Sequence, residues 1–294
     1  MQHLDPRSLA AGAAPLASLP AVYVRLSQAL KNPKVSAVKI ADIISEDASL
    51  VARLLRLVNS PFYGFNGRIE TVSHAVGLVG TDQISELALA TCVLRMFRGI
   101  PAQLVDMNAF WLHGLATGVA ARVIGMRRGE TNVERLFVAG ILHDVGRLVM
   151  YQGLPDLACG MLSHRSDDEL MVETERKLLG FDHADVGGEL LLAWNLPDSL
   201  VAATAFHHRP DLDPTAPMAS ATIHLADLVV HTLEAGNSGE PRVPPLNPEA
   251  WERLGLPVSA LSSILGQTQF ELRETIASPL YRDMWSASRR PRAG

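Results

Sequence analysis

Apolar residues recur at helical spacing along most of this 294-residue chain, whereas the alternating pattern of β-strands is nearly absent. The first clear example contains the apolar positions Val22, Leu26, Ala29 and Leu30. Steps of three and four residues place these side chains on one face of a helix. No stretch rich in β-branched residues shows the sustained period of two that a strand requires. The sequence therefore predicts an all-α fold.

Changes in composition and periodicity divide the predicted helices into segments. Residues 1–18 are biased toward Ala, Ser and Pro without periodicity, and they are predicted to form a flexible N-terminal arm. Residues 19–100 are predicted to form an N-terminal helical subdomain. Residues 101–235 predict a second helical subdomain, and 236–294 a loop followed by C-terminal helices that pack on the core. Beyond residue 100 the periodicity predicts helices at 106–126, 131–150, 155–163, 168–179, 183–194, 198–207, 217–234 and 258–277.

Composition is that of a globular protein, with 48% hydrophobic and 19% charged residues. A formal net charge of -5 disfavours nucleic-acid binding, which requires a broad basic face. The short basic clusters at Arg127-Arg128 and at 289–292 are explained by a solvated loop and a chain end. Two cysteines, Cys92 and Cys159, give no disulfide framework, and we expect both to be buried reduced thiols.

The sequence favours a cytoplasmic protein with no membrane partner. No continuous apolar run reaches about 18 residues, the length needed to cross a bilayer. The first residues lack a positively charged region, and Pro15 and Pro20 interrupt the Ala-rich stretch that follows. A secretory signal peptide would not have this pattern.

A histidine–aspartate pair interrupts the apolar segment 137–150. His143 and Asp144 are flanked by Gly140 and Gly146, whose small size allows other helices to approach closely. Burying a charge without a partner is costly, so both side chains need partners. A divalent metal ion would satisfy both of them.

Other candidate ligands lie on successive predicted helices. Together with the pair they form the series His113, His143, Asp144, His183, His207, His208 and Asp227. Any one of these residues would more often be a structural core residue. Imidazole and carboxylate together suit divalent ions such as iron, manganese, zinc or nickel. A carboxylate that bridges two ions, which is the dinuclear alternative, is suited to hydrolysis of phosphate esters.

This series resembles the HD superfamily of metal-dependent phosphohydrolases, and more closely the HDOD proteins, the "HD-related output domain" of bacterial signalling. The resemblance extends from about residue 15 to residue 275. The stretches that carry it are Leu19–Val22, Ile43–Leu50, Leu54–Tyr63, Leu142–Gly146, His183–Gly188, Trp194–Pro197 and His207-His208. It implies a two-lobe helical fold, in which an N-terminal bundle packs on an HD-like lobe.

The resemblance also implies a regulatory or scaffolding role, often without catalysis. The chain differs from the related HD-GYP cyclic-di-GMP phosphodiesterases in three ways. No Gly-Tyr-Pro sequence follows His207-His208, and Arg147 replaces the lysine that follows the His-Asp motif. Ala109 stands four residues before His113, where those enzymes carry a glutamate.

Two functions follow from these observations. The first is a bacterial signal-transduction protein with a metal site, which binds a nucleotide, another phosphorylated ligand or a signalling protein, as a monomer or a homodimer. The second is an active metal-dependent phosphohydrolase or phosphodiesterase, with Asp144 and Arg147 as catalytic residues. In either case Arg147 and Arg209 are predicted to bind phosphate, because a guanidinium can do so bidentately.

Two further alternatives remain open from the sequence alone. The histidines and aspartates could form a buried polar network that only orders the helices. A helix, Gly80 and a second helix could form a helix-turn-helix that binds DNA, although no basic recognition helix follows Gly80.

Overall fold

The computed structural model of the chain describes residues 4–13, 18–60, 63–65, 67–94, 96–97, 100–164 and 168–277. Over these residues the structure contains sixteen α-helices, one 3-10 helix and no strand. The predicted all-α fold is therefore confirmed. The basic cluster at 289–292 lies outside the described residues.

Contacts between residues divide the chain into two compact units. The larger unit comprises Met1–Ser18 and Met96–Leu265, and the smaller unit comprises Leu19–Arg95 and Gly266–Gly294. The last helix, α16 (Ala260–Ala277), therefore contributes residues to both units.

The smaller unit contains five further helices with clear local start signals. They are α2 (Ala21–Leu30), α3 (Ala37–Ser45), α4 (Ala48–Val58), α5 (Val72–Val79) and α6 (Thr81–Val93). Ser36, Asp47 and Thr71 cap α3, α4 and α5, because each side chain accepts a hydrogen bond from a backbone N–H of the first turn. The core of this unit is apolar, with fully buried side chains that include Leu26, Ile40, Ile44, Leu50, Leu54, Ile84 and Leu87.

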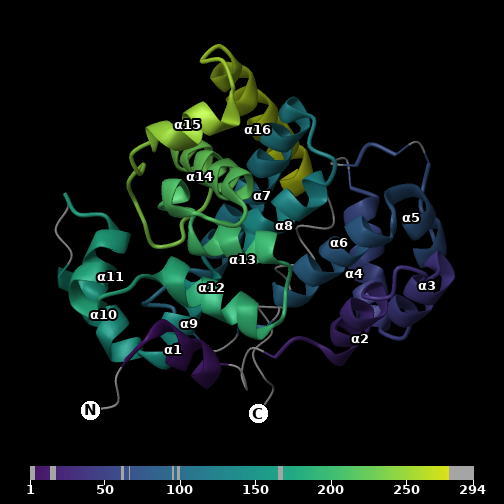
Figure 1. Cartoon of the computed structure of the whole chain (residues 1–294), viewed down its shortest axis with the longest axis horizontal. Helices are drawn as coiled ribbons and strands as arrows, with labels where there is room; N and C mark the ends of the chain where they lie inside the picture. Colours follow the sequence, from purple (N-terminus) through teal and green to yellow (C-terminus); the bar gives the residue numbers. More distant parts are fainter. Residues whose placement is uncertain are drawn as a thin grey trace. The chain divides into compact units, whose positions relative to one another are not determined.

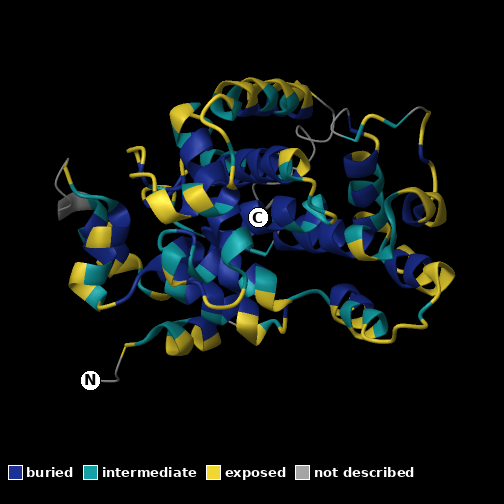
Figure 2. Cartoon of the chain, turned by 45° about the horizontal axis from the view of Figure 1, so that its top comes forward, coloured by how far each residue is buried: buried dark blue, intermediate teal, exposed yellow. Residues whose placement is uncertain are grey.

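The larger unit contains the remaining elements. They are α1 (Pro6–Ala13), α7 (Met107–Arg128), α8 (Val133–Leu142), α9 (Val145–Gly153), α10 (Pro155–His164), α11 (Met171–Leu179), α12 (His183–Ala193), α13 (Asp198–Ala205), the 3-10 helix η1 (Pro210–Leu212), α14 (Pro217–Thr232) and α15 (Pro248–Leu254). In Figure 1, α7 to α15 run from teal through green to yellow-green, α1 is purple, and α7, α8, α12, α13 and α14 are grouped together. In both units, buried residues line the sides of helices that face other helices (Figure 2).

The central helix of the larger unit is α7. Its length and mean hydropathy of 1.2 over an 18-residue window are those of a membrane span, which corrects the expectation that no stretch reaches this length. However, 78% of that window is buried inside the structure. This burial is typical of a core helix, and α7 packs against α8 and α14.

The segment 131–150 was expected to form one helix, but it divides into α8 and α9 at His143 and Asp144. Close approaches on both sides of the break explain this. A Cβ atom at Gly140 would lie 2.5 Å from the backbone nitrogen of Gly118 on α7, and one at Gly146 would collide with the carbonyl oxygen of His183. The two glycines therefore bring α7 and α12 up to the histidine–aspartate pair.

Two expectations from the sequence differ from the structure. Residues 6–13, within the predicted flexible arm, form α1, which lies on α9 and α12 and buries Ala10 and Ala13. Cys92 is buried as expected, and burial raises the pKa of its thiol to about 11. Cys159 is exposed, so the prediction of a buried thiol is wrong there. Its apolar neighbours in sequence lie on a helix with one solvent-facing side.

Candidate metal centre

Five parts of the larger unit bring all seven predicted ligands together. In chain order these are His113 of α7, His143 and Asp144 between α8 and α9, His183 at the start of α12, His207 and His208 after α13, and Asp227 of α14. We call these seven residues the histidine–aspartate cluster. Six of them are buried and His208 is half-buried.

Asp144 lies at the middle of the cluster, and its two carboxylate oxygens face different imidazoles. Oδ1 is 3.0 Å from Nε2 of His183 and 3.8 Å from Nε2 of His207. Oδ2 is 3.3 Å from Nε2 of His143 and 3.9 Å from Nε2 of His113. This carboxylate can therefore contribute one oxygen to each of two neighbouring sites.

Asp227 supplies the second carboxylate of the cluster. Its Oδ1 is 2.9 Å from Nε2 of His113 and 3.6 Å from Nε2 of His143. His231, one turn later on α14, places its Nε2 3.4 Å from the same oxygen. His231 is not among the ligands predicted from the sequence, although its position four residues after Asp227 places both side chains on one helical face.

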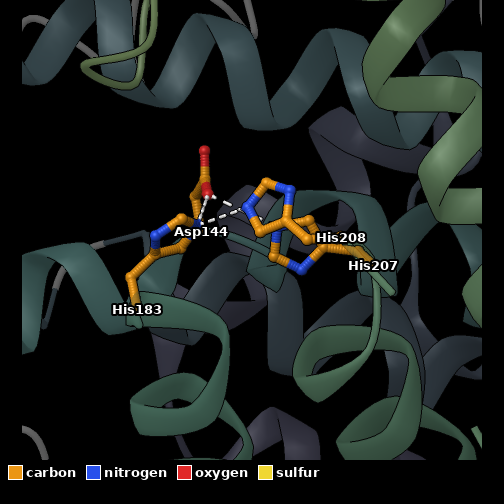
Figure 3. A group of neighbouring side chains, drawn as sticks. All are labelled: Asp144, His183, His207 and His208. Atoms are coloured by element: carbon orange, nitrogen blue, oxygen red, sulfur yellow. Dashed lines mark hydrogen bonds and ion pairs between the residues drawn. The ribbon is translucent and has the colours of Figure 1, made fainter. Parts of the chain in front are cut away.

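The donor atoms fall into groups that share members. Asp144, His183, His207 and His208 form one group, within which the candidate ligand atoms lie within 4.8 Å of one another (Figure 3). His113, His143 and Asp144 form a second group, and His113, Asp227 and His231 a third. Asp144 belongs to the first two groups, so its carboxylate is shared between them.

Hydrogen bonds on the outer side of the cluster fix how its rings are oriented. Nδ1 of His143 lies 2.7 Å from the carbonyl oxygen of Gly140, and Nδ1 of His207 lies 2.8 Å from that of Thr204. A carbonyl oxygen can only accept, so each Nδ1 carries the proton and each Nε2 has a free lone pair when the ring is neutral. This is the tautomer that metal-binding histidines commonly adopt.

Glu175 of α11 orients His183 in the same way. Its Oε2 lies 2.5 Å from Nδ1 of His183 and also accepts the backbone N–H of that residue. Glu175 was missed in the sequence because it lies eight positions before His183 in a helix with a charged outer face. Only the turn between α11 and α12 brings the two together.

Two ring nitrogens in the cluster indicate that a metal ion fits. Nε2 of His143 and Nε2 of His207 are buried, and neither has a hydrogen-bond partner within the described part of the chain. Buried polar atoms are seldom left unpaired in proteins, and a network that only orders helices would satisfy them. A divalent ion between these nitrogens and the Asp144 carboxylate would remove the deficit, and this donor set is one that transition metals prefer.

Electrostatics in the cluster also suit a cation. Burial disfavours a charge on His143, but the Asp144 carboxylate more than offsets this and raises the pKa of His143 to about 10. Burial opposes ionisation of Asp144 as well, yet the charges on His143 and Arg147 hold its pKa well below the usual range. Burial and the charge on His143 lower the pKa of His207 to about 3. The cluster therefore keeps an ionised Asp144 carboxylate beside a neutral His207 imidazole, both in the form that binds metals, whereas His143 would release its proton on binding an ion.

The two arginines predicted to bind phosphate lie in different surroundings. Arg147 is 1% exposed, its Nε is 3.4 Å from Oδ1 of Asp144, and its Nη1 has no hydrogen-bond partner among the described residues. Arg209 is partly exposed, and its Nη2 lies 3.1 Å from Oδ1 of Asp185 on α12. Their roles in phosphate binding remain predictions.

His224 shares α14 with Asp227 but does not join the cluster. Its Nδ1 donates to the carbonyl oxygen of His207, and its Nε2 accepts the backbone N–H of Asn247. It therefore links α14 to the segments on either side.

The segment Gly236–Glu240 covers part of the centre. A Cβ atom at Gly236 would collide with the backbone nitrogen of His113, and Gly239 lies against the Arg147 guanidinium. Glu240 is buried and accepts a hydrogen bond from the backbone N–H of Met171. The glycines and the serine of Gly236–Glu240 are typical of a flexible loop, whereas in the structure this segment packs against the cluster.

Comparison with known proteins gives relatives that share this fold. The HDOD domain protein of unknown function from Geobacter sulfurreducens superposes with a TM-score of 0.74 at 22% identity, covering 94% of this chain and 98% of that one. A proposed phosphohydrolase from Shewanella amazonensis SB2B gives 0.72 at 23% identity, covering 91% and 98%. A proposed signal transduction protein from Marinobacter aquaeolei VT8 gives 0.69 at 21% identity, covering 91% and 59%.

Sequence comparison defines the family. An uncharacterized protein of Treponema pallidum (strain Nichols) is 26% identical over 222 residues, which are 74% of this chain but only 42% of that protein. This chain thus spans less than half the length of that curated relative. The family model for the HDOD domain matches residues 16–210, about two thirds of the chain. The match includes six of the seven cluster residues, and the chain belongs to the HDOD domain family.

Proposed function

We propose that this chain is a regulatory protein of bacterial signal transduction whose HD-type centre holds one or two divalent transition-metal ions. The observation that supports this most directly is the position of Asp144. One of its oxygens faces His183 and His207, and the other faces His143 and His113. Iron, manganese, zinc and nickel all accept such a combination of imidazole and carboxylate.

Burial of the centre favours a regulatory role over turnover. Six of the seven cluster residues are buried, and His208 is half-buried. Ions can occupy an enclosed centre and order the surrounding helices, whereas a large substrate needs an opening.

In this proposal the metal ions stabilise one conformation of the larger unit. A nucleotide, another phosphorylated ligand or a signalling protein then binds to that conformation. The function is exercised in the cytoplasm without nucleic acid or membrane, by a monomer or a homodimer. Membership in the HDOD family supports a signalling role.

The alternative function, a metal-dependent phosphohydrolase or phosphodiesterase, is favoured by the same bridging carboxylate. Two ions bridged in this way stabilise both the attacking and the leaving oxygen of a phosphate ester. Asp144 would hold the ions, while the unpartnered Nη1 of Arg147 would donate a hydrogen bond to a phosphate oxygen. This function requires Gly236–Glu240 to move away from Arg147.

Metal analysis of protein purified without added metal or chelator tests the proposal. Wild type should contain transition metal, up to two ions per chain, and Asp144→Ala should contain none. Asp156→Ala, which removes an exposed carboxylate on α10, is the matched control and should retain the metal. If wild type contains no metal and takes up none on reconstitution, the proposed function is wrong.

The metal-loaded protein then distinguishes the two functions. Phosphodiesters and nucleotides are assayed both for hydrolysis and for binding. Saturable binding without turnover supports the regulatory function. Turnover that is lost in Asp144→Ala and kept in Asp156→Ala would instead establish the phosphohydrolase.

A further inference from the structure

His231 extends the metal centre beyond the residues that the sequence singled out. It lies on α14 one helical turn after Asp227, and its side chain is 9% exposed. Its ring centroid is 4.8 Å from that of His113. The candidate ligand atoms of His113, Asp227 and His231 all lie within 4.8 Å of one another. Because metal–ligand bonds are about 2.0–2.2 Å long, a single ion can contact all three after small adjustments.

The imidazole of His231 is directed at the centre by the nitrogen that the other rings also use. His113, His143, His183 and His207 all approach a carboxylate through Nε2, and His231 does the same. His231 shares Asp227 Oδ1 with two of these rings, those of His113 and His143. Its geometry therefore matches that of the predicted ligands.

The chain that follows α14 encloses this side of the centre. Gly236 has a φ of +80° and packs against the backbone of His113. The backbone N–H of Asn237 donates to the carbonyl oxygen of Ala109, at 3.0 Å. Ala109 itself contributes no side-chain ligand, so α14 supplies the additional donor atom on this side.

We propose that His231 is a ligand of the ion held by His113 and Asp227. This inference rests on the proposed metal-binding function and adds a residue to it. With His143 and the second oxygen of Asp144, that ion has up to five protein donors, three of them imidazoles. His231 fills a coordination position that would otherwise be open to water or to a phosphate oxygen, whereas catalytic ions keep such a position.

The additional imidazole has a consequence for metal selectivity. Imidazole ligands suit zinc, iron and nickel, whereas manganese and magnesium favour oxygen ligands. The half of the centre around Asp227 therefore selects ions such as Zn²⁺ over Mn²⁺. A tightly held, closed ion of this kind is suited to ordering α7 and α14 rather than to turning over a substrate.

The test compares wild type with His231→Ala and His231→Gln, after metal removal and titration with Zn²⁺ and with Mn²⁺. Glutamine can keep a hydrogen bond to Asp227 but is a poor ligand for transition metals. Wild type should show two Zn²⁺-binding events. Both variants should weaken one event by more than about 100-fold, beyond the roughly 10–100-fold that loss of a supporting hydrogen bond costs. The other event should weaken less, because its ion shares only the Asp144 carboxylate with the ion bound by His231.

His74→Ala, which removes an exposed histidine on α5, is the control and should bind both ions as wild type does. Circular dichroism of the metal-free variants checks that each one folds. An NMR spectrum of the histidine ring nitrogens in the Zn²⁺-loaded wild type tests the inference without any substitution. It should show metal-bound Nε2 signals from all six histidines of the candidate donor groups, including His231.

The outcomes separate this inference from the proposed function. If His231→Gln binds Zn²⁺ like wild type while His231→Ala does not, His231 only orients Asp227 and the inference is wrong. Wild-type binding in both variants, or a free Nε2 signal for His231, would also overturn it. In each of these cases the two binding events in wild type would still support the metal-binding function, which fails only if wild type binds no metal.

Discussion

The two units of the chain bury very different cores. The smaller unit encloses aliphatic side chains such as Leu26, Ile40 and Leu54, and its stability follows from apolar burial. The larger unit encloses, besides its apolar residues, a polar core that includes His113, His143, His183, His207, Asp144, Asp227 and Arg147. Buried charges contribute to stability only when they are paired, so the larger unit depends on the integrity of one polar cluster. Under the proposed function, regulation acts on the larger unit, because a bound ion changes the polar core and not the apolar core.

The largest effect should come from removing the carboxylate shared by both groups of imidazoles. Asp144→Ala leaves charged groups of the larger unit without a partner, and we expect it to lose the metal and to cost about 3–5 kcal/mol of unfolding free energy. Leu54→Ala, in the core of the smaller unit, should cost a similar amount, about 2–5 kcal/mol, by leaving a cavity. It should nevertheless keep the metal. Denaturant unfolding and metal analysis of both variants test this, and loss of metal from Leu54→Ala would show that the two cores are not separable.

Metal removal should have the next largest effect. An ion present at 100 times its dissociation constant stabilises the state that binds it by about 2.7 kcal/mol. Hydrogen exchange should therefore slow on Zn²⁺ addition in α7, α8, α9, α12 and α14, and should be unchanged in α2–α5. Asp144→Ala should show no response. Equal protection of both units would contradict a centre that orders only its own helices.

Much of this organisation could be predicted from the sequence because it depends on local patterns. Apolar spacing predicts the helices, and local signals such as Ser36 mark where they begin, since serine is a favoured residue at the helix start and its side chain caps α3. The histidine–aspartate pair stood out because polar residues are rare in an apolar helical run. The convergence of His113 and Asp227 with this pair followed from a resemblance that covers most of the chain.

The missed features depend on contacts that leave no local pattern. Glu175 meets His183 only through the turn between α11 and α12, and Gly236–Glu240 has a loop-like composition although it packs on the cluster. His231 was detectable in principle, since it lies one turn after Asp227. It was passed over because a histidine in an apolar helix is usually structural. Position on a helix identifies which side chains share a face, but not what lies opposite that face.

A smaller effect is expected from the residue that orients His183. Glu175→Gln keeps the shape and one hydrogen bond but removes the negative charge beside Nδ1, so the ring becomes a weaker ligand. Zn²⁺ affinity at the half of the centre formed by Asp144, His183 and His207 should fall by about 10–100-fold. Glu173→Gln, an exposed change on the same helix, is the control. Equal affinities in the two variants would mean that Glu175 has only a structural role.

The smallest effect on stability should come from Arg209, and this separates it from Arg147. The pair between Arg209 and Asp185 has side chains that are 35% and 30% exposed, and such pairs contribute about 0.2–1 kcal/mol. Arg209→Ala should therefore keep both the fold and the metal, as should the control Arg25→Ala in the smaller unit.

Because its guanidinium already reaches solvent, Arg209 can contact a phosphate without rearrangement, whereas Gly239 packs against the guanidinium of Arg147. The metal-loaded variants are titrated with inorganic phosphate and with a nucleoside monophosphate. Arg209→Ala should bind these ligands about tenfold more weakly than wild type, which is the effect of losing one hydrogen bond to a charged group. Arg25→Ala should bind them as wild type does. Unchanged binding in Arg209→Ala would mean that Arg209 only pairs with Asp185 and does not bind phosphate. Arg147 could then bind phosphate only if Gly236–Glu240 moves away from it.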